Sequence, residues 1–211
     1  MKNALVIGGT GLVGRYLLSE LLENGIYKKV VLLTRSLIDL SHPKLEQQIV
    51  DFDSIDRIGF SVDDVYCCLG TTIRKAGSKE AFIKVDLDYP IKIAELALEA
   101  GASSFGIVTS MGADAVSRYF YNQVKGKVEE KLSSLGYGRL LVLRPSLLLG
   151  DRKEKRFGEA FGKLFMKVFS FLIPLNYKAV HGKKVARAMR VNMEGDKQGV
   201  EILSSGAIQG Y

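Results

Sequence analysis

The sequence predicts an α/β protein built on a doubly wound parallel sheet, and three observations support this fold class. Short apolar runs alternate with longer stretches whose apolar residues recur three and four positions apart, which is typical of strands alternating with helices. Within the runs the apolar residues are mostly consecutive, as in strands that are buried on both faces. The first run leads directly into a glycine-rich turn and then into a helical stretch. A length of 211 residues suits one compact core, so we expect a single domain over residues 1–211.

In chain order, the apolar runs and the periodic stretches supply the elements of this fold. We expect strands at residues 4–7, 30–33, 48–50, 65–68, 105–108, 140–143 and 200–203. We expect helices at residues 12–24, 90–99, 121–135 and 184–193. Three of them are followed by glycine, the residue that a helix C-terminus favours: Gly25, Gly101 and Gly136. Alternation of this kind places helices on both faces of a parallel sheet.

The turn after the first strand has the spacing of a dinucleotide-binding site. Gly8, Gly11 and Gly14 are each three residues apart. A side chain at the first two positions would block the approach of backbone amides to a pyrophosphate, and the third lets the helix pack close to the strand. The helix N-terminus then favours the negative phosphates. We expect a Rossmann fold rather than a merely flexible loop, with the cofactor along Gly8, Thr10, Gly11, Leu12, Val13 and Gly14.

The end of the second strand indicates which nicotinamide cofactor is bound. An acidic residue there would bind the ribose hydroxyls of NAD, but the sequence has Thr34-Arg35-Ser36. A guanidinium matches a ribose 2′-phosphate with paired, charge-assisted hydrogen bonds. We therefore expect NADP(H) in preference to NAD(H), with Arg35 and Ser36 at the phosphate. NAD(H) remains the alternative if Arg35 is an ordinary surface residue.

Two further strand ends supply candidate cofactor contacts. Asp51 follows the third strand and could meet the amino group of the adenine. Leu69, Gly70 and Thr71 follow the fourth strand and could lie along the cofactor. Strand ends of a doubly wound sheet line the crevice in which the ligand binds, which is the reason for these choices.

Tyr121 and Lys125 are four residues apart and therefore lie on one face of the expected helix 121–135. The spacing by itself is common, so the stronger evidence is the position of the pair in the chain. The pair begins the helix that follows the fifth strand, and that strand ends in Thr109 and Ser110. A tyrosine, a lysine and a hydroxyl are thus expected beside the crevice.

The order of glycine turn, strand-end hydroxyl and Tyr-x-x-x-Lys resembles the short-chain dehydrogenase/reductase superfamily. Four stretches are similar to its atypical, extended-like branch, which holds the Tat-interacting oxidoreductase group and bacterial relatives of nucleoside-diphosphate-sugar epimerases. They are residues 67–72 (Cys-Cys-Leu-Gly-Thr-Thr), 75–77, 123–126 and 143–146. The resemblance covers nearly the whole chain, and the first of these stretches is far more specific than the glycine pattern.

The resemblance implies a division of roles in catalysis. Tyr121 would be the general acid/base during hydride transfer, Lys125 would activate it and hold the nicotinamide ribose, and Thr109 or Ser110 would orient the substrate carbonyl. A free phenol has a pKa near ~10, which is too high for a good base at neutral pH, and a nearby ammonium lowers it. Pro145 would turn the backbone against the nicotinamide amide, unless it simply ends its strand.

One departure from the superfamily pattern concerns the proton relay. Many members carry an asparagine on the fourth helix that completes the relay through a bound water. Here residues 85–88 read Val-Asp-Leu-Asp, so the nearest candidates are Asp86 and Asp88. The tyrosine–lysine chemistry does not depend on this position, whereas the relay through water does.

The net charge of +7 is concentrated in residues 151–190, which hold eleven basic and three acidic side chains. Residues 159–174 have the pattern of an amphipathic helix with a narrow cationic stripe. The resemblance implies a small C-terminal cap here, facing a small anionic or carbonyl substrate such as a nucleotide sugar. A homodimer interface, peripheral membrane contact and a solvated basic face are the alternatives. Nucleic acid is not expected, because no aromatic residues for base stacking interleave the lysines.

Composition excludes several other classes of protein. A hydrophobic share of 47% and a charged share of 25% exclude disordered and fibrous chains. The only cysteines, Cys67 and Cys68, are adjacent, and the two histidines stand apart, so we expect neither a disulfide framework nor a metal site. No apolar run reaches the ~20 residues of a membrane span, and glycines end the first run too early for a secretory signal. We therefore expect a cytoplasmic protein.

These observations lead to one expected function and one alternative. We expect an NADP-dependent oxidoreductase or nucleotide-sugar epimerase-like enzyme of unknown substrate. The alternative is a non-catalytic module of the same fold that senses NADPH and passes its occupancy to a protein partner. Both need the nucleotide, and only the enzyme needs the phenol of Tyr121.

Overall fold

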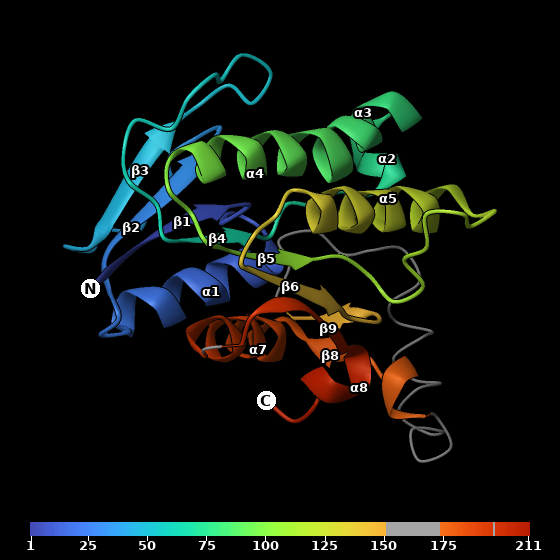
Figure 1. The fold of residues 1–211 in the computed structure, drawn as a ribbon. Helices are drawn as coiled ribbons and strands as arrows, with labels where there is room; N and C mark the ends of the chain where they lie inside the picture. The colour runs from blue at the N-terminus through green and yellow to red at the C-terminus, as the bar shows by residue number, and fades with distance from the viewer. Residues whose placement is uncertain (151–173, 196) are drawn as a thin grey trace.

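The computed structural model describes residues 1–150, 174–195 and 197–211, and a seven-stranded sheet forms its centre (Figure 1). The strand order is β3-β2-β1-β4-β5-β6-β9, and every neighbouring pair is parallel. The strands are β1 (Lys2–Ile7), β2 (Tyr27–Thr34), β3 (Leu45–Ile49), β4 (Asp64–Cys67), β5 (Ser104–Val108), β6 (Arg139–Arg144) and β9 (Gly199–Ser204). The predicted doubly wound parallel sheet is confirmed. Its order reverses between β1 and β4, where such folds bind their ligands.

Helices cover both faces of the sheet, and two very short strands stand outside it. The helices are α1 (Leu12–Glu23), α2 (Ile73–Ala76), α3 (Lys79–Ile83), α4 (Tyr89–Glu99), α5 (Phe120–Ser134), α7 (Gly182–Glu194) and α8 (Ser205–Ile208). A π-helical turn, η1 (Lys84–Asp88), joins α3 to α4, and a 3-10 turn, η2 (Leu175–Tyr177), precedes α7. β7 (Leu148–Leu149) and β8 (Val180–His181) pair in parallel as a separate ribbon.

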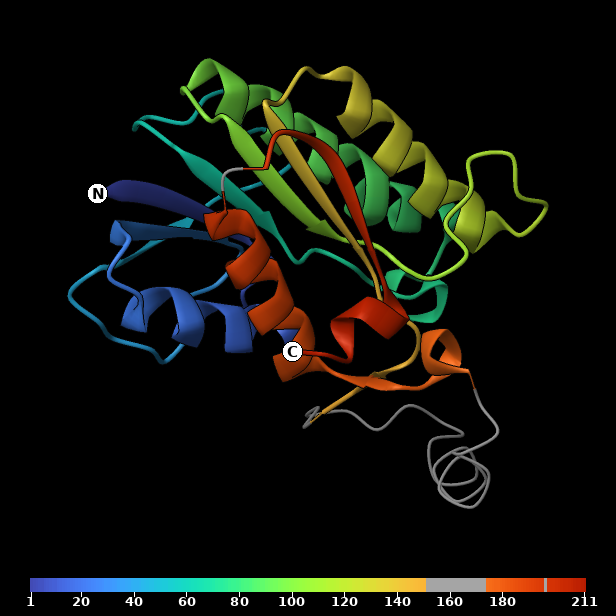
Figure 2. The ribbon, with the colours of Figure 1, turned by 60° about the horizontal axis from the view of Figure 1, so that its bottom comes forward.

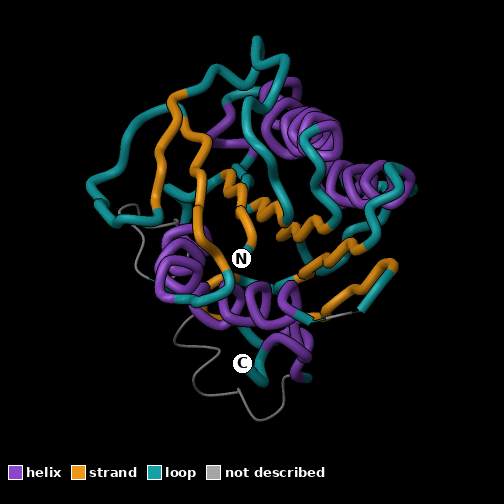
Figure 3. The backbone as a smooth tube through the Cα atoms, turned by 60° about the vertical axis from the view of Figure 1, so that its left-hand side comes forward, coloured by secondary structure: helices purple, strands orange, loops and turns teal. Residues whose placement is uncertain are grey.

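The inner strands carry consecutive apolar residues because the sheet lies between two layers of helices (Figure 3). In β1, Leu5 and Ile7 pack in the cluster that includes α4 and α5, whereas Ala4 and Val6 pack in the cluster that includes α1 and α7. All four side chains are 0% exposed. In Figure 2, α7 runs beside α1, on the face of the sheet opposite α4 and α5.

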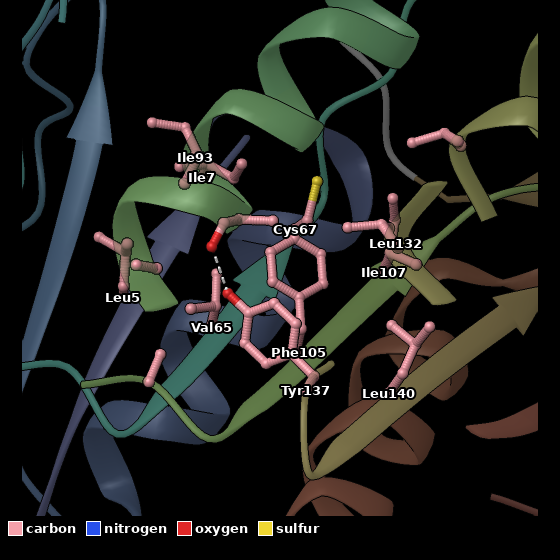
Figure 4. Packing of buried hydrophobic residues seen from close by; sticks show 14 of the residues in the cluster. Leu5, Ile7, Val65, Cys67, Ile93, Phe105, Ile107, Leu132, Tyr137 and Leu140 are labelled. Atoms are coloured by element: carbon pink, nitrogen blue, oxygen red, sulfur yellow. Dashed lines mark hydrogen bonds between the residues drawn. The ribbon is translucent and has the colours of Figure 1, made fainter. Parts of the chain in front are cut away.

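The cluster under α4 is held by an aromatic pair and one hydrogen bond (Figure 4). The rings of Phe105 and Tyr137 lie 5.3 Å apart at 55°. The Tyr137 hydroxyl donates to the carbonyl of Ala94 in α4 at 2.6 Å, drawn as a dashed line in Figure 4. Burial raises the pKa of Tyr137, so this hydroxyl keeps its proton.

A second buried polar group lies at the amino end of the sheet. The Tyr27 hydroxyl donates to the carboxylate of Asp64 at 2.7 Å and lies 2.6 Å from the hydroxyl of Tyr66. Lys2 pairs with the same carboxylate at 3.1 Å. Burial is the main cause that raises the pKa of both tyrosines. This group ties β1, β2 and β4 together on the side of the sheet away from the glycine turn.

The helix predicted to begin at Pro90 begins earlier, because α3, η1 and α4 form one continuous helical path from Lys79 to Glu99. Pro90 has no amide hydrogen to give to the carbonyl of Asp86 four residues before it, and its ring crowds that carbonyl. The wider turn of η1 relieves this conflict, and the Tyr89 amide donates to the carbonyl of Lys84 five residues earlier. The helix therefore passes through the proline instead of starting there.

Other sequence predictions of the elements are confirmed with small shifts. β3 starts three residues before the expected strand. Gly101 and Gly136 adopt φ of +96° and +82°, as expected after helices. Gly25 does not adopt a positive φ, because α1 ends at Asn24 in extended backbone. The short helices α2, α3 and α8 were not predicted, since four or five residues carry no periodicity.

The expected cap is described only in part. The predicted amphipathic helix at residues 159–174 lies, except for its last residue, outside the described residues. Residues 182–190, at the end of the expected cap segment, belong to α7 instead. Val185, Ala186 and Met189 of this helix are 0% exposed and pack with α1.

Candidate active site

The glycine turn packs backbone against backbone between β1, α1 and the end of β4. Gly8 adopts φ +78°, and a Cβ there would lie 2.4 Å from the carbonyl carbon of Cys68. A Cβ on Gly14 would lie 2.2 Å from the carbonyl oxygen of Gly8. The Gly11 amide donates to the same carbonyl at 3.0 Å and closes the turn. No side chain fits at the first or third glycine, because neighbouring backbone atoms occupy the space where its Cβ would lie.

The N-terminus of α1 opens at this turn. Its N-cap residue is Gly11, no side-chain hydrogen bond caps the helix, and the first amide to reach back is that of Arg15, which donates to the Gly11 carbonyl at 3.1 Å. The amides of Leu12, Val13 and Gly14 are the orphan donors of the first turn. Thr10 is exposed beside them. This arrangement fits a pyrophosphate, because backbone donors and the positive end of the helix dipole meet at one place.

Arg35 lies at the same edge of the sheet. Ile7 pairs with Leu33 in the register of β1 and β2, so the residues just after both strands are neighbours. The Thr34 hydroxyl donates to the carbonyl of Ser36 at 2.7 Å and tightens the turn around Arg35. The Arg35 side chain is exposed, and the structure shows no ion pair between it and the other described residues.

Asp51 lies two residues beyond β3 and holds its own turn. Its carboxylate accepts hydrogen bonds from the amide of Asp53 and from the hydroxyl of Ser54, each at 3.0 Å. The next residue, Phe52, is buried and its ring stacks on that of Tyr89 at 5.4 Å. Asp51 itself is exposed, so its carboxylate can still accept a further donor.

Residues 69–71, after β4, lie against a buried ion pair. The carboxylate of Asp86 is 2.7 Å from the Lys125 ammonium, and the two side chains are 0% and 4% exposed. The Thr71 amide donates to the other oxygen of this carboxylate at 2.9 Å. A Cβ on Gly70 would lie 3.7 Å from Asp86 and 3.9 Å from the ammonium. The loop, Asp86 and Lys125 thus form one connected group, while Leu69 packs against the core.

The charge of Lys125 is maintained by its neighbours. Burial by itself lowers the pKa of this lysine, but the negative charge of Asp86 and, next, the phenol of Tyr121 raise it, and the net direction is upward. The side chain is therefore an ammonium throughout the physiological range.

Tyr121 stands one helical turn before Lys125 at the start of α5. It is half-buried, and its ring lies 5.6 Å from that of Phe82 in α3 at an angle of 42°. The tyrosine therefore has one side against the core and a part that remains accessible to a ligand. Tyr121 and Lys125 both lie in α5, and Val124 and Val128, between and beyond them, are buried in the core.

The two candidate hydroxyls have different surroundings. The Thr109 hydroxyl donates to the carboxylate of Glu129 at 2.6 Å, and Arg144 binds the same carboxylate with two of its nitrogens. The Ser110 hydroxyl oxygen is buried and has no hydrogen-bond partner among the described residues. Thr109 is thus committed to a structural network, and Ser110 is the hydroxyl that remains available.

Pro145 follows β6 and helps to shape the same region. It is buried, and its carbonyl accepts the amide of Met111 at 2.9 Å. The chain just after Ser110 is therefore fastened to the chain just after β6.

The structure joins most of the predicted site residues into connected groups. The glycine turn adjoins Cys68, residues 69–71 adjoin Lys125, and Tyr121 precedes Lys125 on one face. Arg35 and Asp51 lie outside these groups, just after the neighbouring strands β2 and β3. No three His, Cys, Asp or Glu side chains are grouped as metal ligands within the described ranges.

Two features of the site were not assigned from the sequence. Asp86 was noted only as a departure from the asparagine pattern, and the only signal for its role was its position in that pattern. The Glu129–Arg144 pair gave no signal, because the two residues are fifteen positions apart and lie on different elements.

Comparison with known proteins identifies the family. A sequence profile described as the NAD dependent epimerase/dehydratase family matches residues 4–123, more than half of the chain. The chain belongs to this family. The membership is consistent with the nucleotide-binding, oxidoreductase- or epimerase-like fold described above.

Individual relatives of this epimerase/dehydratase family protein cover nearly all of it. Protein HTATIP2 of Rattus norvegicus is 39% identical over 98% of this chain and 88% of its own length. Protein FMP52, mitochondrial, of Eremothecium gossypii is 35% identical over 98% of this chain and 95% of its own length. The solved structure of MoeE5 in complex with UDP-glucose and NAD has a TM-score of 0.72 at 15% identity, over 96% of this chain and 76% of that one. At that identity the last comparison shows a shared fold.

The relatives correct the expected location. The Eremothecium gossypii protein and further fungal relatives, at 30% and 31% identity, are named mitochondrial, so the expectation of a cytoplasmic protein is wrong. That expectation depended on the lack of a secretory signal and of a membrane span. Neither feature bears on import into mitochondria, because mitochondrial targeting segments are amphipathic. Among the described helices, none is long and apolar enough to cross a membrane.

Proposed function

We propose that the protein is an NADP(H)-dependent oxidoreductase with Tyr121 as its general acid/base, acting on a small carbonyl substrate or a nucleotide sugar. The observation that carries this proposal is the buried Lys125 ammonium. It is held one turn from Tyr121 and against Gly70, in the loop after β4 at the switch point of the sheet. A phenol beside a fixed positive charge is the arrangement that proton transfer at neutral pH requires.

Along the edge of the sheet, the residues that would hold the cofactor follow the order of the cofactor's own parts. The orphan amides of Leu12, Val13 and Gly14 would bind the pyrophosphate. Arg35, with Ser36, would bind the 2′-phosphate of NADP, and Asp51 the adenine amino group. Lys125 would hold the nicotinamide ribose, and the bound cofactor would supply or accept the hydride.

The chain's own residues would handle the proton. The Tyr121 hydroxyl would donate to the substrate oxygen, or its phenolate would accept from it, depending on direction. Ser110, whose hydroxyl is without a partner among the described residues, would orient that oxygen. Thr109 is not assigned this role because its hydroxyl already donates a hydrogen bond to Glu129.

The relatives support a nicotinamide cofactor, and the preference for NADP(H) rests on Arg35 alone. The family's own description is NAD dependent, and MoeE5, which shares the fold, was solved with both NAD and a nucleotide sugar. A nucleotide sugar is therefore the second substrate class to include in any screen.

The test compares Tyr121→Phe with Tyr119→Phe over a panel of carbonyl compounds and nucleotide sugars. Tyr119 is 75% exposed and provides a matched control two residues away. We expect Tyr121→Phe to lose ~10²–10⁴-fold in turnover and to keep NADPH binding, with Tyr119→Phe unchanged. Full activity in Tyr121→Phe would contradict the proposal. Normal NADPH binding without wild-type turnover on any substrate would favour an NADPH sensor instead.

Cofactor choice has its own test, a thermal-shift comparison of NADPH and NADH at equal concentration. A ligand at 100 times its dissociation constant stabilises by ~2.7 kcal/mol, so the preferred cofactor gives the larger shift. We expect that cofactor to be NADPH in the wild type, and the difference to disappear in Arg35→Ala. A larger shift with NADH would overturn the assignment of Arg35.

A further inference from the structure

Four large apolar side chains are exposed on the loops beyond the carboxyl ends of β5 and β6. Met111 follows β5 and is 37% exposed, and Leu147 follows β6 and is 41% exposed. Leu175 and Tyr177 of η2 are 59% and 62% exposed. Single exposed apolar residues are normal, whereas a group of them in one region marks a binding surface. These four residues are called the apolar surface below.

Hydrogen bonds between the loops hold the apolar surface together. The Met111 amide donates to the carbonyl of Pro145 at 2.9 Å, two residues before Leu147. The Ser146 hydroxyl donates to the carbonyl of the residue that follows Tyr177. The loop after β5, the loop after β6 and the turn η2 are therefore neighbours, although they lie more than sixty residues apart in the sequence.

The apolar surface adjoins the groups that are proposed to act on the substrate oxygen. Met111 directly follows Ser110 in the chain. A Cβ on Gly112 would lie 3.1 Å from the side-chain nitrogen of Asn122, the residue next to Tyr121. The loop that carries Met111 therefore passes over the start of α5, where Tyr121 stands.

The same region also reaches the proposed cofactor site. A Cβ on Gly150 would lie 2.7 Å from the side chain of Leu12, and a Cβ on Gly182 would lie 3.0 Å from it. Leu12 is the first residue of α1, whose amides are proposed to bind the pyrophosphate. The chain just after Leu147 thus packs on the helix start that the cofactor would use.

The side chains of the apolar surface indicate the polarity of the ligand. None of the four is a lysine, an arginine, an aspartate or a glutamate, and Lys178 is the one lysine or arginine of residues 174–181. An alkyl chain gains free energy with every methylene that such side chains remove from water. A diphosphate would lose its water there without gaining a matching charge. The surface therefore favours an alkyl chain over a nucleotide sugar.

We propose, building on the function proposed above, that the apolar surface binds the alkyl chain of the carbonyl substrate, and that the protein reduces aliphatic aldehydes in preference to acting on nucleotide sugars. The carbonyl carbon receives a hydride and both its electrons from the reduced nicotinamide, which is oxidised. The carbonyl oxygen takes the proton of the Tyr121 hydroxyl as the C=O double bond becomes a C–O single bond. The phenolate then regains a proton from water.

The first test measures kcat/KM with NADPH for butanal, hexanal and octanal. A methylene that leaves water completely is worth about a 4-fold gain, so we expect ~2–4-fold per methylene on this partly exposed surface. Octanal should then exceed butanal by ~16–250-fold. A kcat/KM that stays level or falls with chain length overturns the proposal.

Variants of the apolar surface show whether it is the source of this chain-length dependence. In Leu147→Asn and in Met111→Asn we expect the ratio of octanal to butanal to fall by ~5-fold or more, with the rate on butanal little changed. Val191→Asn in α7 is the matched control, since Val191 is 39% exposed on another part of the molecule and its ratio should stay as in the wild type. Equal losses on both aldehydes would mean a structural effect and would contradict the assignment.

A binding measurement needs no turnover. Butanamide, octanamide and UDP-glucose, none of which is an aldehyde, are titrated calorimetrically into the protein with and without NADP. We expect octanamide to bind ~16-fold or more tightly than butanamide, and Leu147→Asn to remove most of this difference. Tighter binding of UDP-glucose than of octanamide, or equal binding of the two amides, overturns the proposal.

The two measurements separate this proposal from the function on which it rests. If the wild type reduces no aldehyde and no member of the wider panel, the proposed function fails, whereas the amide titration still decides whether the surface binds alkyl chains. If aldehydes are reduced without regard to length, the proposed function stands and the assignment of the apolar surface fails.

Discussion

At the scale of single residues, neighbouring hydroxyls at the end of β5 have separate tasks. The Thr109 hydroxyl donates a hydrogen bond to Glu129, which Arg144 also binds, and these contacts join β5, α5 and β6. Ser110 makes no hydrogen bond with any described residue although its oxygen is buried. A buried polar atom without a partner costs stability, and it is tolerated where a ligand supplies the partner.

This contrast predicts opposite effects of two conservative substitutions. We expect Ser110→Ala to keep its stability and to lose ~10²–10³-fold in kcat, since one donor to the substrate oxygen is removed. We expect Thr109→Val to lose ~1–3 kcal/mol of unfolding free energy, because Glu129 loses a buried donor, and to keep most of its turnover. Urea unfolding and initial-rate kinetics on both variants check this. The reverse pattern would mean that the Thr109 hydroxyl is the one that orients the substrate oxygen.

The residues of the site differ in how far the sequence could predict them. Tyr121 and Lys125 were predictable because helical spacing and a strand end place both, and Gly8 and Gly14 because only glycine tolerates that turn. The choice between Thr109 and Ser110 was open, since it depends on Glu129, twenty residues away. The pairing of Asp86 was not predictable, because its direction depends on a π turn that leaves no periodic signal.

At the scale of elements, the fit of α1 against β1 depends on the absence of one side chain. The helix starts so close to the strand that a methyl group on Gly14 would overlap the Gly8 carbonyl, at 2.2 Å. Gly25, just beyond the other end of α1, has no atom within 4 Å of where its Cβ would be. The same substitution therefore has very different consequences at the two ends of one helix.

We expect Gly14→Ala to cost ~1–3 kcal/mol or more by overpacking and to abolish the thermal shift with NADPH. Gly25→Ala should stay within ~0.5 kcal/mol of the wild type and bind NADPH normally. Differential scanning fluorimetry with and without NADPH measures both effects. Normal NADPH binding in Gly14→Ala would mean that the turn does not contact the pyrophosphate.

At the scale of the whole molecule, the central strands were predictable and the edges less so. β1, β4 and β5 are buried on both faces beyond their polar first residues, and there each reads as an unbroken non-polar run. β3 at one edge is only half-buried and reads Leu-Glu-Gln-Gln-Ile, so its start was misplaced by three residues. The helix start was predicted wrongly at Pro90 because a proline in the first turn is far commoner than one inside a helix.

Buried tyrosines should make the whole fold sensitive to alkali. Tyr27, Tyr66 and Tyr137 have pKa values raised by burial, so each keeps its proton in the folded state after losing it in the unfolded state. Their stabilisation is fully present below pH ~10, the unfolded value, and is lost as the pH rises above it. Lys125, whose pKa is also raised, acts in the same direction above its own unfolded value.

Each such tyrosine should therefore contribute up to ~1.4 kcal/mol per pH unit to the fall in unfolding free energy above pH ~10. We expect Tyr137→Phe to be ~0.5–1.5 kcal/mol less stable at pH 8, through loss of the bond to Ala94, and to show a shallower alkaline slope. Urea denaturation from pH 8 to 11 measures both quantities. If the unfolding free energies of the wild type and Tyr137→Phe fall equally steeply with pH, Tyr137 ionises in the folded state as readily as in the unfolded state.

The wide turn η1 also accommodates one extra residue inside a long helix. Such a turn takes up the extra residue locally, so removing it would restore ordinary winding with little change in the direction of Phe82. The ring of Pro90 would then crowd the carbonyl four residues before it. A homologue that is one residue shorter between Phe82 and Pro90 should therefore also lack this proline.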